Sequence, residues 1–317
     1  MASVGLIINE KSERAASLLS DLLYITKRFS NVCTEVLDGV SRLGGALDKM
    51  NKREVDTLIV AGGDGTLQAV FTDAINNSRF GRMPGYVALP CGMTNVIAND
   101  CGLSGTPTRS LDNFLWRRQK GEVRPLSRPL LTVQPEGERP VYGFFMGAGV
   151  FCSAVDFSRS HVQSKGAKRS LALGMSVGGY IARLAVNPSK TISPVGIEML
   201  DIDGAPSLDS ESRLRTIYLA TTLTRLGGGI YPFWGKGDGA MATTLVDYPS
   251  EKFLRAAISV VRGKSRPWFE GSGYRSWRSN GQTLRFDGSY VFDGEFFTAE
   301  RSRPLSIKTS HSAQFLN

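Results

Sequence analysis

Two glycine-bearing turns carry the polar side chains that are best placed for chemistry. In "DTLIVAGGDGTLQAVFTDAI", residues 56–75, an apolar run ends at Gly62 and Gly63, Asp64 follows, and an amphipathic segment begins near Thr66. Backbone N–H groups at a strand-to-helix turn, together with the helix dipole, favour phosphate oxygens, and glycines let a ligand approach closely. A carboxylate repels phosphate unless a cation lies between them. We therefore interpret Asp64 as a ligand of Mg²⁺ or of a metal-bound water, with Thr66 capping the helix or donating to an oxygen.

The second turn has the same design. In "ALPCGMTNVIANDCGL", residues 88–103, an apolar strand ends before Gly92, and the polar Thr94 and Asn95 open a helix. A GGDG sequence alone is also ordinary turn chemistry, because Asp-Gly is a common turn dipeptide. The sequence has no Walker GxxxxGK[ST] pattern and no GxGxxG after a strand, which disfavours ordinary P-loop and dinucleotide-binding interpretations.

The elements that position both turns alternate along the first 120 residues. Strands are expected at 3–8, 31–37, 56–61 and 85–90, and helices at 12–29, 42–52, 66–76, from about Thr94, and at 108–121, where Gly121 is a C-terminal stop. Strands separated by helix-sized segments predict a parallel sheet with crossovers. Ligands bind such sheets beyond the carboxyl ends of the strands, which is the edge that both turns occupy.

After Arg124 the pattern changes to short β-rich segments. Strands are expected around a Pro-Glu-Gly turn in 128–147 and within 193–202, 213–223, 242–247 and 282–295, with helices at about 167–186 and 250–262. This pattern indicates a largely antiparallel sandwich. The predicted fold is an α/β domain with a parallel sheet over residues 1–123 and a mainly antiparallel β-sandwich domain over 124–300. Residues from about 300 to 317 are expected to pack back on the first domain.

The formal net charge of +9 is unevenly distributed. No acid occurs from Phe157 to Ile197 or from Lys252 to Phe269, although both stretches carry several Lys and Arg residues. Basic faces attract nucleic acid, anionic lipid head groups or phosphorylated substrates, and a solvated surface explains a charge run equally well. No nucleic-acid-binding signature is present, so no nucleic-acid partner is expected.

The apolar runs and the cysteines indicate the cellular compartment of the protein. The sequence has no apolar run of about 18 residues, and its N-terminal apolar stretch is too short for a signal peptide. We therefore expect a cytoplasmic protein without a spanning segment. Four cysteines without CxxC spacing are expected to be buried, reduced thiols: Cys33, Cys91, Cys101 and Cys152.

GGDGT, followed by a strand that ends in a proline-glycine-asparagine turn, resembles the diacylglycerol kinase catalytic-domain family. This group of lipid kinases includes bacterial diacylglycerol kinases and their sphingosine and ceramide kinase relatives. "IINEKS" (7–12) stands where the family has Asn-Pro-x-Ser-Gly, and "LGGGIYPFWGKGDGAMATTLVD" (226–247) resembles its Gly-Gly-Gly stretch and Asp-Gly segment. "VFDGE" (291–295) matches its Asp-Gly-Glu. The motifs span nearly the whole chain, in order.

The resemblance implies that the first domain, which is similar to NAD kinases and phosphofructokinases, binds ATP with Mg²⁺, and that the second domain binds the acceptor across a cleft. The positions carried over for nucleotide contact are Asn9, Gly62, Gly63, Asp64, Gly65, Thr66, Gly92, Thr94 and Asn95. Asp293 and Glu295 inherit the catalytic role of Asp-Gly-Glu, beside Asp64. A hydroxyl that attacks a γ-phosphate needs such a carboxylate to orient it and take its proton. Residues i and i+2 on a strand point the same way, so both acids are expected to face the cleft, and which one is the base stays open.

The family resemblance says less about two further aspartates, Asp287 and Asp238. Asp287 is expected to form an ordinary Asp-Gly hairpin turn. Asp238 resembles an aspartate that the family links to a structural Mg²⁺ site, and a turn is nearly as good an interpretation.

The chain departs from the family at Gly92-Met93-Thr94-Asn95, where Gly-Thr-Gly-Asn is usual. Thr94 is then expected to supply the displaced hydroxyl. "NEKS" also lacks the usual proline and glycine, and Lys11 is a candidate for phosphate contact in their place.

We therefore expect an ATP-dependent kinase that transfers the γ-phosphate to the hydroxyl of diacylglycerol or a related lipid at an anionic membrane surface. Tyr231, Phe233 and Trp234 are expected either at the rim of an apolar cleft or in the sandwich core. One alternative is an NAD-kinase-like enzyme with a soluble substrate, although an Asn-x-Gly-x-x-Gly-Phe-Leu segment is absent. Another is a non-catalytic module that binds lipid or nucleotide. The oligomeric state stays open, a homo-oligomer included.

Overall fold

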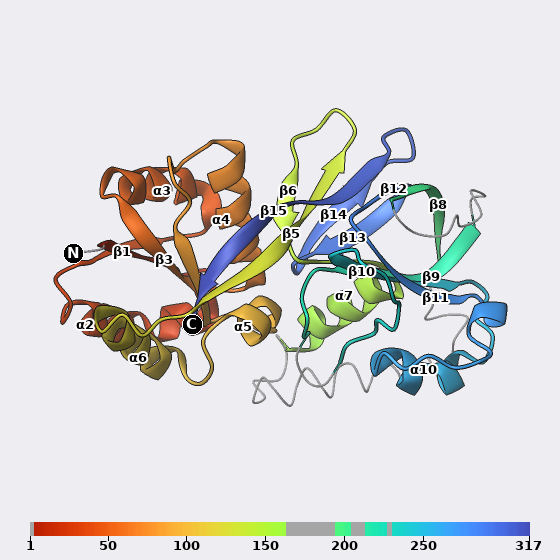
Figure 1. Ribbon diagram of the computed structural model, residues 1–317, viewed down its shortest axis with the longest axis horizontal. Helices are drawn as coiled ribbons and strands as arrows, with labels where there is room; N and C mark the ends of the chain where they lie inside the picture. The colour runs from red at the N-terminus through yellow and green to blue at the C-terminus, as the bar shows by residue number, and fades with distance from the viewer. Residues whose placement is uncertain (1–2, 163–193, 204–212, 227–229) are drawn as a thin grey trace. The chain divides into compact units, whose positions relative to one another are not determined.

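The computed structural model describes residues 3–162, 194–203, 213–226 and 230–317 (Figure 1). Its contacts fall into two units. Unit 1 comprises Met1–Leu130, Val141–Gly143 and His311–Asn317, and unit 2 comprises Leu131–Pro140 and Phe144–Ser310. Strands β5 (Pro125–Pro135) and β15 (Leu305–Leu316) contribute to both units. The predicted helix at 167–186 lies outside the described residues.

Unit 1 is an α/β domain built on a parallel sheet, as the sequence predicts. Its strands are β1 (Ser3–Asn9), β2 (Val32–Leu37), β3 (Val55–Gly62) and β4 (Gly85–Pro90), paired in parallel in the order β2-β1-β3-β4. The end of β15 adds a further parallel partner, because Phe315 pairs with Tyr86 of β4. In Figure 1 the chain's C-terminus accordingly lies beside the strands of this unit. β1, β3 and β4 are almost entirely buried, which suits the apolar runs typical of parallel strands covered on both faces.

Helices connect the strands of unit 1. They are α1 (Glu13–Ser17), α2 (Leu19–Thr26), the short 3₁₀ helix η1 (Val40–Arg42), α3 (Leu43–Lys52), α4 (Asp64–Asn76), α5 (Val96–Cys101) and α6 (Pro107–Gln119). The helix predicted at 12–29 is broken at Leu18, which has a non-helical ψ of 5°. α4 begins at Asp64, two residues before the predicted start, so this carboxylate belongs to the first turn of a helix.

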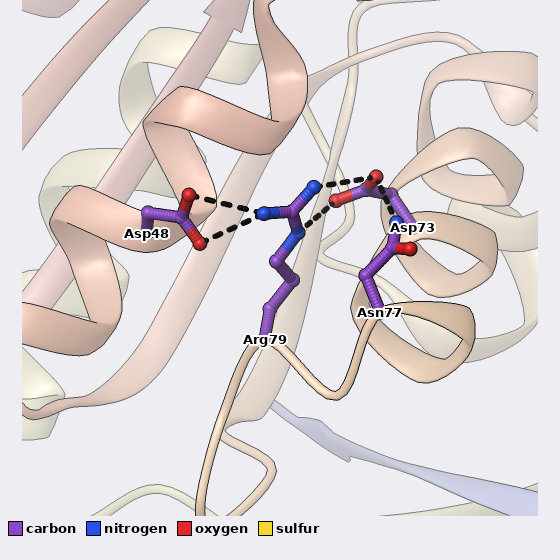
Figure 2. A network of polar contacts seen from close by, with 4 residues as sticks. All are labelled: Asp48, Asp73, Asn77 and Arg79. Atoms are coloured by element: carbon purple, nitrogen blue, oxygen red, sulfur yellow. Dashed lines mark hydrogen bonds and ion pairs between the residues drawn. The ribbon is translucent and has the colours of Figure 1, made fainter.

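A polar network joins α3 to α4 (Figure 2). The Arg79 guanidinium donates through Nη1 to both oxygens of Asp48 on α3, at 3.0 Å each, and through Nε to Asp73 on α4 at 2.8 Å. Asn77 donates to the same Asp73 carboxylate at 2.7 Å. One side chain therefore fixes the C-terminal end of α4, the helix whose other end carries Asp64.

Unit 2 is β-rich, and the pairs among β7–β14 are antiparallel. Its strands are β7 (Phe145–Gly149), β8 (Val195–Ile202), β9 (Arg213–Thr221), β10 (Met241–Asp247), β11 (Tyr274–Ser279), β12 (Gly281–Arg285), β13 (Gly288–Phe292) and β14 (Glu295–Ala299). β9 pairs with β7, β8 and β10, and β13 pairs with β7 and β14. β6 (Val141–Gly143), which belongs to unit 1, pairs with β5. These pairings confirm the mainly antiparallel second domain.

Helical segments also occur in unit 2. α10 (Phe253–Val261) lies within the helix predicted at 250–262. α7 (Val150–Val162) and the 3₁₀ helix η2 (Glu270–Ser272) are not among the predicted elements. Neither are the separate strands β11 and β14.

Candidate functional site

Three loops meet at the carboxyl ends of β1, β3 and β4 in unit 1. Asn9, at the end of β1, is buried and donates through Nδ2 to the hydroxyl of Thr66 on α4 at 2.9 Å. Ser12 donates from its hydroxyl to the carbonyl of Cys91, after β4. Ser12 was not selected as a site residue from the sequence, although it lies inside the IINEKS motif. The predicted nucleotide-contact residues all lie at the ends of β1 and β3, on the loops that follow β3 and β4, or on the first turn of α4, as the parallel-sheet argument requires.

Glycines let the second and third loops touch. A Cβ atom at Gly92 would lie 2.5 Å from the Cα of Gly63, and one at Gly62 would lie 2.6 Å from the Cβ of Thr66. Neither position accepts a side chain without displacing its neighbour. The third loop is further closed by Asn95, which exchanges hydrogen bonds with the backbone of Gly92 at 2.7 and 2.9 Å in a left-handed conformation. Loop-on-loop packing therefore requires these glycines even before a ligand is considered.

The carboxylate of Asp64 joins the two turns. It is buried and accepts hydrogen bonds from the Thr94 hydroxyl at 2.8 Å, the Val96 N–H at 3.0 Å and the Ile97 N–H at 2.9 Å. Val96 and Ile97 are the first residues of α5, whose N–H groups have no partner within the helix. Burial raises the pKa of Asp64, and the hydrogen bonds from Ile97, Thr94 and Val96 oppose that rise. Asp64 thus anchors the start of α5, and Thr94 supplies a hydroxyl to this contact from its unusual position in the GMTN turn.

Thr66 does not cap α4, while its other predicted role, donation to an oxygen, stays a prediction. The residue preceding α4 is Gly63, no side chain caps this helix, and the Thr66 hydroxyl instead accepts the hydrogen bond from Asn9. The capping interpretation of Thr66 is therefore wrong. Because no side chain caps this 13-residue helix, those N–H groups of its first turn that do not donate to the Gly63 carbonyl remain suited to an anion.

The Asp-Gly-Glu segment of unit 2 forms a hairpin turn. Phe292 of β13 pairs with Glu295 of β14, and the two residues between them both have positive φ, 46° at Asp293 and 87° at Gly294. Two-residue hairpin loops of type I′ need positive φ at both positions, and Asp-Gly is one of the dipeptides that accept it. Asp293 therefore does not share a strand with Glu295, and the prediction that both point the same way as i and i+2 of one strand is wrong.

The Asp293 side chain turns into the protein. It is buried, and its carboxylate accepts hydrogen bonds from the N–H groups of Phe144 and Phe145, each at 2.9 Å. Its own N–H donates to the carbonyl of Phe145 at 2.9 Å. Glu295, in contrast, is exposed to solvent. The two predicted catalytic acids thus have different environments, one fixed against the start of β7 and one at the surface.

Asp287 is not part of a hairpin. It lies between β12, which pairs with β8 and β15, and β13, which pairs with β7 and β14. Its carboxylate accepts the backbone N–H of Arg301 at 2.6 Å. The hairpin interpretation of Asp287 is therefore wrong, because the strands on either side of it belong to different pairings.

The remaining predicted residues of unit 2 are spread over a loop and the core. Asp238 is exposed, and the described residues contain no group of three His, Cys, Asp or Glu side chains that could hold a metal ion. Its metal role stays a prediction. Phe233 is buried against Phe145, Leu219 and Ala242, which supports the core interpretation, while Tyr231 and Trp234 are half-buried.

The cysteines are all free thiols. Cys91 and Cys101 are buried as predicted, whereas Cys33 and Cys152 are only half-buried. Burial raises the pKa of Cys91 and of Cys152 to about 11, so both are protonated at neutral pH and weakly nucleophilic. Among the described helices, none has both the length and the apolar character needed to cross a bilayer.

The fold and the site together define an α/β unit with an anion-suited strand-to-helix turn, followed by an antiparallel β unit. Residues 3–124 match the model of the diacylglycerol kinase catalytic domain, which confirms the family resemblance for this segment. The chain is also similar to "Acylglycerol kinase, mitochondrial" of Mus musculus, with 35% identity over 107 residues. That match covers 30% of this chain and 24% of the relative, so the chain spans about a quarter of that protein.

A solved structure extends the similarity of fold to both units. A protein titled as a diacylglycerol kinase from Bacillus anthracis str. Sterne superposes with a TM-score of 0.61, over 98% of this chain and 96% of that one. The sequence identity is 13%, so this likeness concerns the fold.

Proposed function

We propose that the chain is an ATP-dependent lipid kinase, which transfers the γ-phosphate of ATP to a lipid hydroxyl, with diacylglycerol or a related lipid as the acceptor. One observation carries the proposal. The residues selected for nucleotide contact gather at one edge of a parallel sheet, inside the segment that matches the diacylglycerol kinase catalytic domain. Ligands bind α/β sheets at this edge.

The first turn of α4 suits the phosphates of ATP. Gly63 precedes this helix without a side-chain cap, so backbone N–H groups and the helix dipole are available to an anion. Asn9 and Thr66 border the same turn and hold each other in place. Asp64 contributes by fixing α5 and the second turn, since its carboxylate binds three donors there.

Mg²⁺ bound with ATP would neutralise phosphate charge. Oδ2 of Asp64 does not fit direct coordination of this ion, because it already accepts two hydrogen bonds, from the Thr94 hydroxyl and the Val96 N–H. A metal-bound water on Oδ1, which accepts one hydrogen bond, stays a prediction.

Glu295 is the better candidate for the base that takes the proton of the acceptor hydroxyl. It is exposed, whereas both oxygens of Asp293 accept backbone N–H groups that hold the turn against β7. In this proposal Asp293 is a positioning residue, because its hydrogen bonds fix the hairpin from which Glu295 projects.

The same hydrogen bonds favour a second candidate, a nucleotide- or lipid-binding module without transferase activity. Asp64 and Asp293 both accept hydrogen bonds that hold the local structure, so the fold needs both residues even if the protein does not catalyse a reaction. Calorimetric binding of Mg-ATP, without phosphoryl transfer to any lipid of a broad panel, would establish this alternative. Phosphorylation of NAD but of no lipid would instead favour the NAD-kinase-like alternative.

The test is phosphoryl transfer from labelled ATP to detergent-dispersed diacylglycerol, sphingosine and ceramide. We expect Glu295→Gln to lower turnover by about 100-fold or more, the usual contribution of a positioned general base. Glu300→Gln is the matched control, because Glu300 is also exposed and lies one residue beyond β14, and it should retain wild-type turnover. Wild-type turnover in Glu295→Gln would remove Glu295 from the mechanism, and no turnover on any lipid would remove the kinase proposal.

A further inference from the structure

Helix α10 of unit 2 has an apolar outer face. Its inner residues Ala256, Ser259 and Val260 are buried, and Ala256 and Val260 pack with Phe269 and Tyr274. On the outside, Leu254 and Ile258 are 48% and 65% exposed. Because they are four residues apart in a helix, their side chains lie one turn above the other and form a single aliphatic ridge. An exposed ridge of this kind differs from the scattered apolar residues that all surfaces carry.

Cations surround this ridge. Arg255 follows Leu254, Arg262 lies one helical turn beyond Ile258, and Lys252 and Lys264 lie near the two ends of the helix; all four are exposed. No acid occurs between Lys252 and Phe269. Within the described part of the chain, Arg255, Arg262 and Lys264 form no ion pair, so their charge is not neutralised internally. The nearest acids in the sequence are Glu251 and Glu270, outside the stretch on either side.

The residues of this stretch that do have partners hold the surface together. Arg266 donates through Nε to the hydroxyl of Ser259 at 2.8 Å, which ties the following loop to the inner face of α10. The Lys252 ammonium lies 5.4 Å from the centre of the Trp268 ring, and Trp268 stacks edge-on against the buried Phe269. The helix and the loop that follows it therefore form one supported surface.

We propose that this α10 surface, defined by Leu254, Ile258, Lys252, Arg255, Arg262 and Lys264, docks the protein on an anionic membrane. Aliphatic side chains on a short helix lying flat on a bilayer enter the boundary between head groups and acyl chains, and flanking Lys and Arg pair with anionic head groups. An aliphatic ridge and uncompensated positive charge on the same face are the features that bind a helix to the surface of an anionic bilayer. This inference rests on the proposed function and deepens it, because docking on a membrane would bring the protein to its lipid acceptor.

The test is co-sedimentation of the full chain with vesicles of phosphatidylcholine, with and without an equal amount of phosphatidylglycerol. The wild-type protein should bind the anionic vesicles, and binding should weaken as salt is added. Leu254→Glu/Ile258→Glu should lower the affinity by about tenfold or more, because acids replace the inserted aliphatics. Arg255→Ala/Arg262→Ala should lower it by about 25-fold at low salt, since each basic residue near such a surface contributes about fivefold.

Matched controls separate docking from general effects. Tyr24→Glu adds an acid at a 70% exposed aromatic of α2, and Arg42→Ala/Lys52→Ala removes two exposed cations of unit 1; neither should change vesicle affinity by more than about twofold. Thermal unfolding of each variant establishes that it folds. Equal affinities of wild type and both α10 variants, or binding to neutral vesicles alone, would overturn the proposal. So would a concentration-dependent dimer that only the Leu254→Glu/Ile258→Glu variant loses, because the surface would then bind a second copy of the chain.

The test of vesicle binding and the test of catalysis can fail independently of each other. Wild-type protein that binds anionic vesicles through α10 but transfers no phosphate supports the docking surface while the kinase proposal fails. An active enzyme on detergent-dispersed lipid whose α10 variants bind vesicles normally keeps the kinase proposal and overturns the docking surface.

Discussion

The surroundings of Asp64 give this carboxylate a structural role, while its predicted metal role stays a prediction. Three donors, the Thr94 hydroxyl and the N–H groups of Val96 and Ile97, point at its two oxygens. The hydrogen bonds link the start of α4 to the start of α5, which are separated by about one crossover of the chain. Asp64, which stands out in the sequence as an acid in a glycine turn, thus holds the two turns of the site together.

Asp64→Asn tests this positioning role. An amide of the same shape places an NH₂ group against at least one N–H or O–H donor, which leaves buried groups unsatisfied. We expect the free energy of unfolding to fall by about 1–3 kcal/mol in metal-free buffer at pH 7, measured by urea denaturation. Asp38→Asn is the control, because Asp38 is an exposed acid in a surface ion pair with Lys11, and its effect should be below about 0.5 kcal/mol. If Asp64→Asn unfolds at the wild-type urea concentration, the carboxylate does not hold α5.

The types and positions of the site residues were accessible from the sequence, and their partners were not. Glycines before Asp64 and at Gly92 follow directly from strand-to-helix turn chemistry. Which N–H groups point at Asp64 depends on how one loop packs on another, and spacing along the chain carries no information on this. Asp293 shows the same limit, because an Asp-Gly hairpin and a catalytic acid have the same local sequence and differ in what the carboxylate contacts.

At the level of elements, Arg79 holds α3 and α4 together. Its guanidinium contacts Asp48 and Asp73 at the same time, and a Cβ at Gly44 of α3 would lie 2.6 Å from its Nη2 atom. A planar group with five donors can satisfy two carboxylates in fixed directions, whereas an ammonium cannot reproduce that geometry. The hydrogen bonds that the guanidinium donates to Asp73 and Asp48 raise the pKa of Arg79.

Arg79→Lys should therefore fail to replace arginine. We expect both Arg79→Lys and Arg79→Ala to lower the free energy of unfolding by about 1 kcal/mol, a modest value because the side chain is 24% exposed and partly screened by solvent. A double-mutant cycle with Asp73→Ala should give a coupling of about 0.5–1 kcal/mol. Arg118→Lys is the control, because Arg118 binds one carboxylate, that of Asp56. Full stability in Arg79→Lys would mean that charge alone, without the forked geometry, joins the helices.

The elements that the sequence predicted best are those with the strongest apolar pattern. β4 occupies the predicted residues 85–90, because a buried parallel strand is a continuous apolar run bounded by turn residues. α7 was missed although residues 150–162 have an amphipathic pattern no weaker than that of α6, which was predicted. The break at Leu18 was missed because the apolar spacing continues across it while the backbone does not.

At the scale of the whole chain, unit 1 is completed by its last residues. The end of β15 pairs in parallel with β4, and the ring of Phe315 is fully buried. Phe315 lies 6.1 Å from Phe71 of α4, which in turn contacts Tyr86 of β4 at 4.7 Å between ring centres. The segment that matches the kinase catalytic domain, residues 3–124, does not contain this strand. A fragment limited to that segment would therefore expose the edge of β4 and the apolar surface that Phe315 covers.

Phe315→Ala in the full chain measures how much this strand contributes. Loss of a fully buried aromatic ring should lower the free energy of unfolding of unit 1 by about 3–5 kcal/mol, followed by urea denaturation. Tyr24→Ala, at a 70% exposed aromatic of the same unit, is the control and should change it by less than about 0.5 kcal/mol. A fragment of residues 1–143, which retains Val141–Gly143 of unit 1, should bind a hydrophobic dye and unfold without a cooperative transition, and joining residues 311–317 to its end through a flexible linker should restore cooperativity. If the fragment alone unfolds as cooperatively as unit 1 does in the full chain, the C-terminal strand is an addition to a finished domain, and the family segment folds by itself.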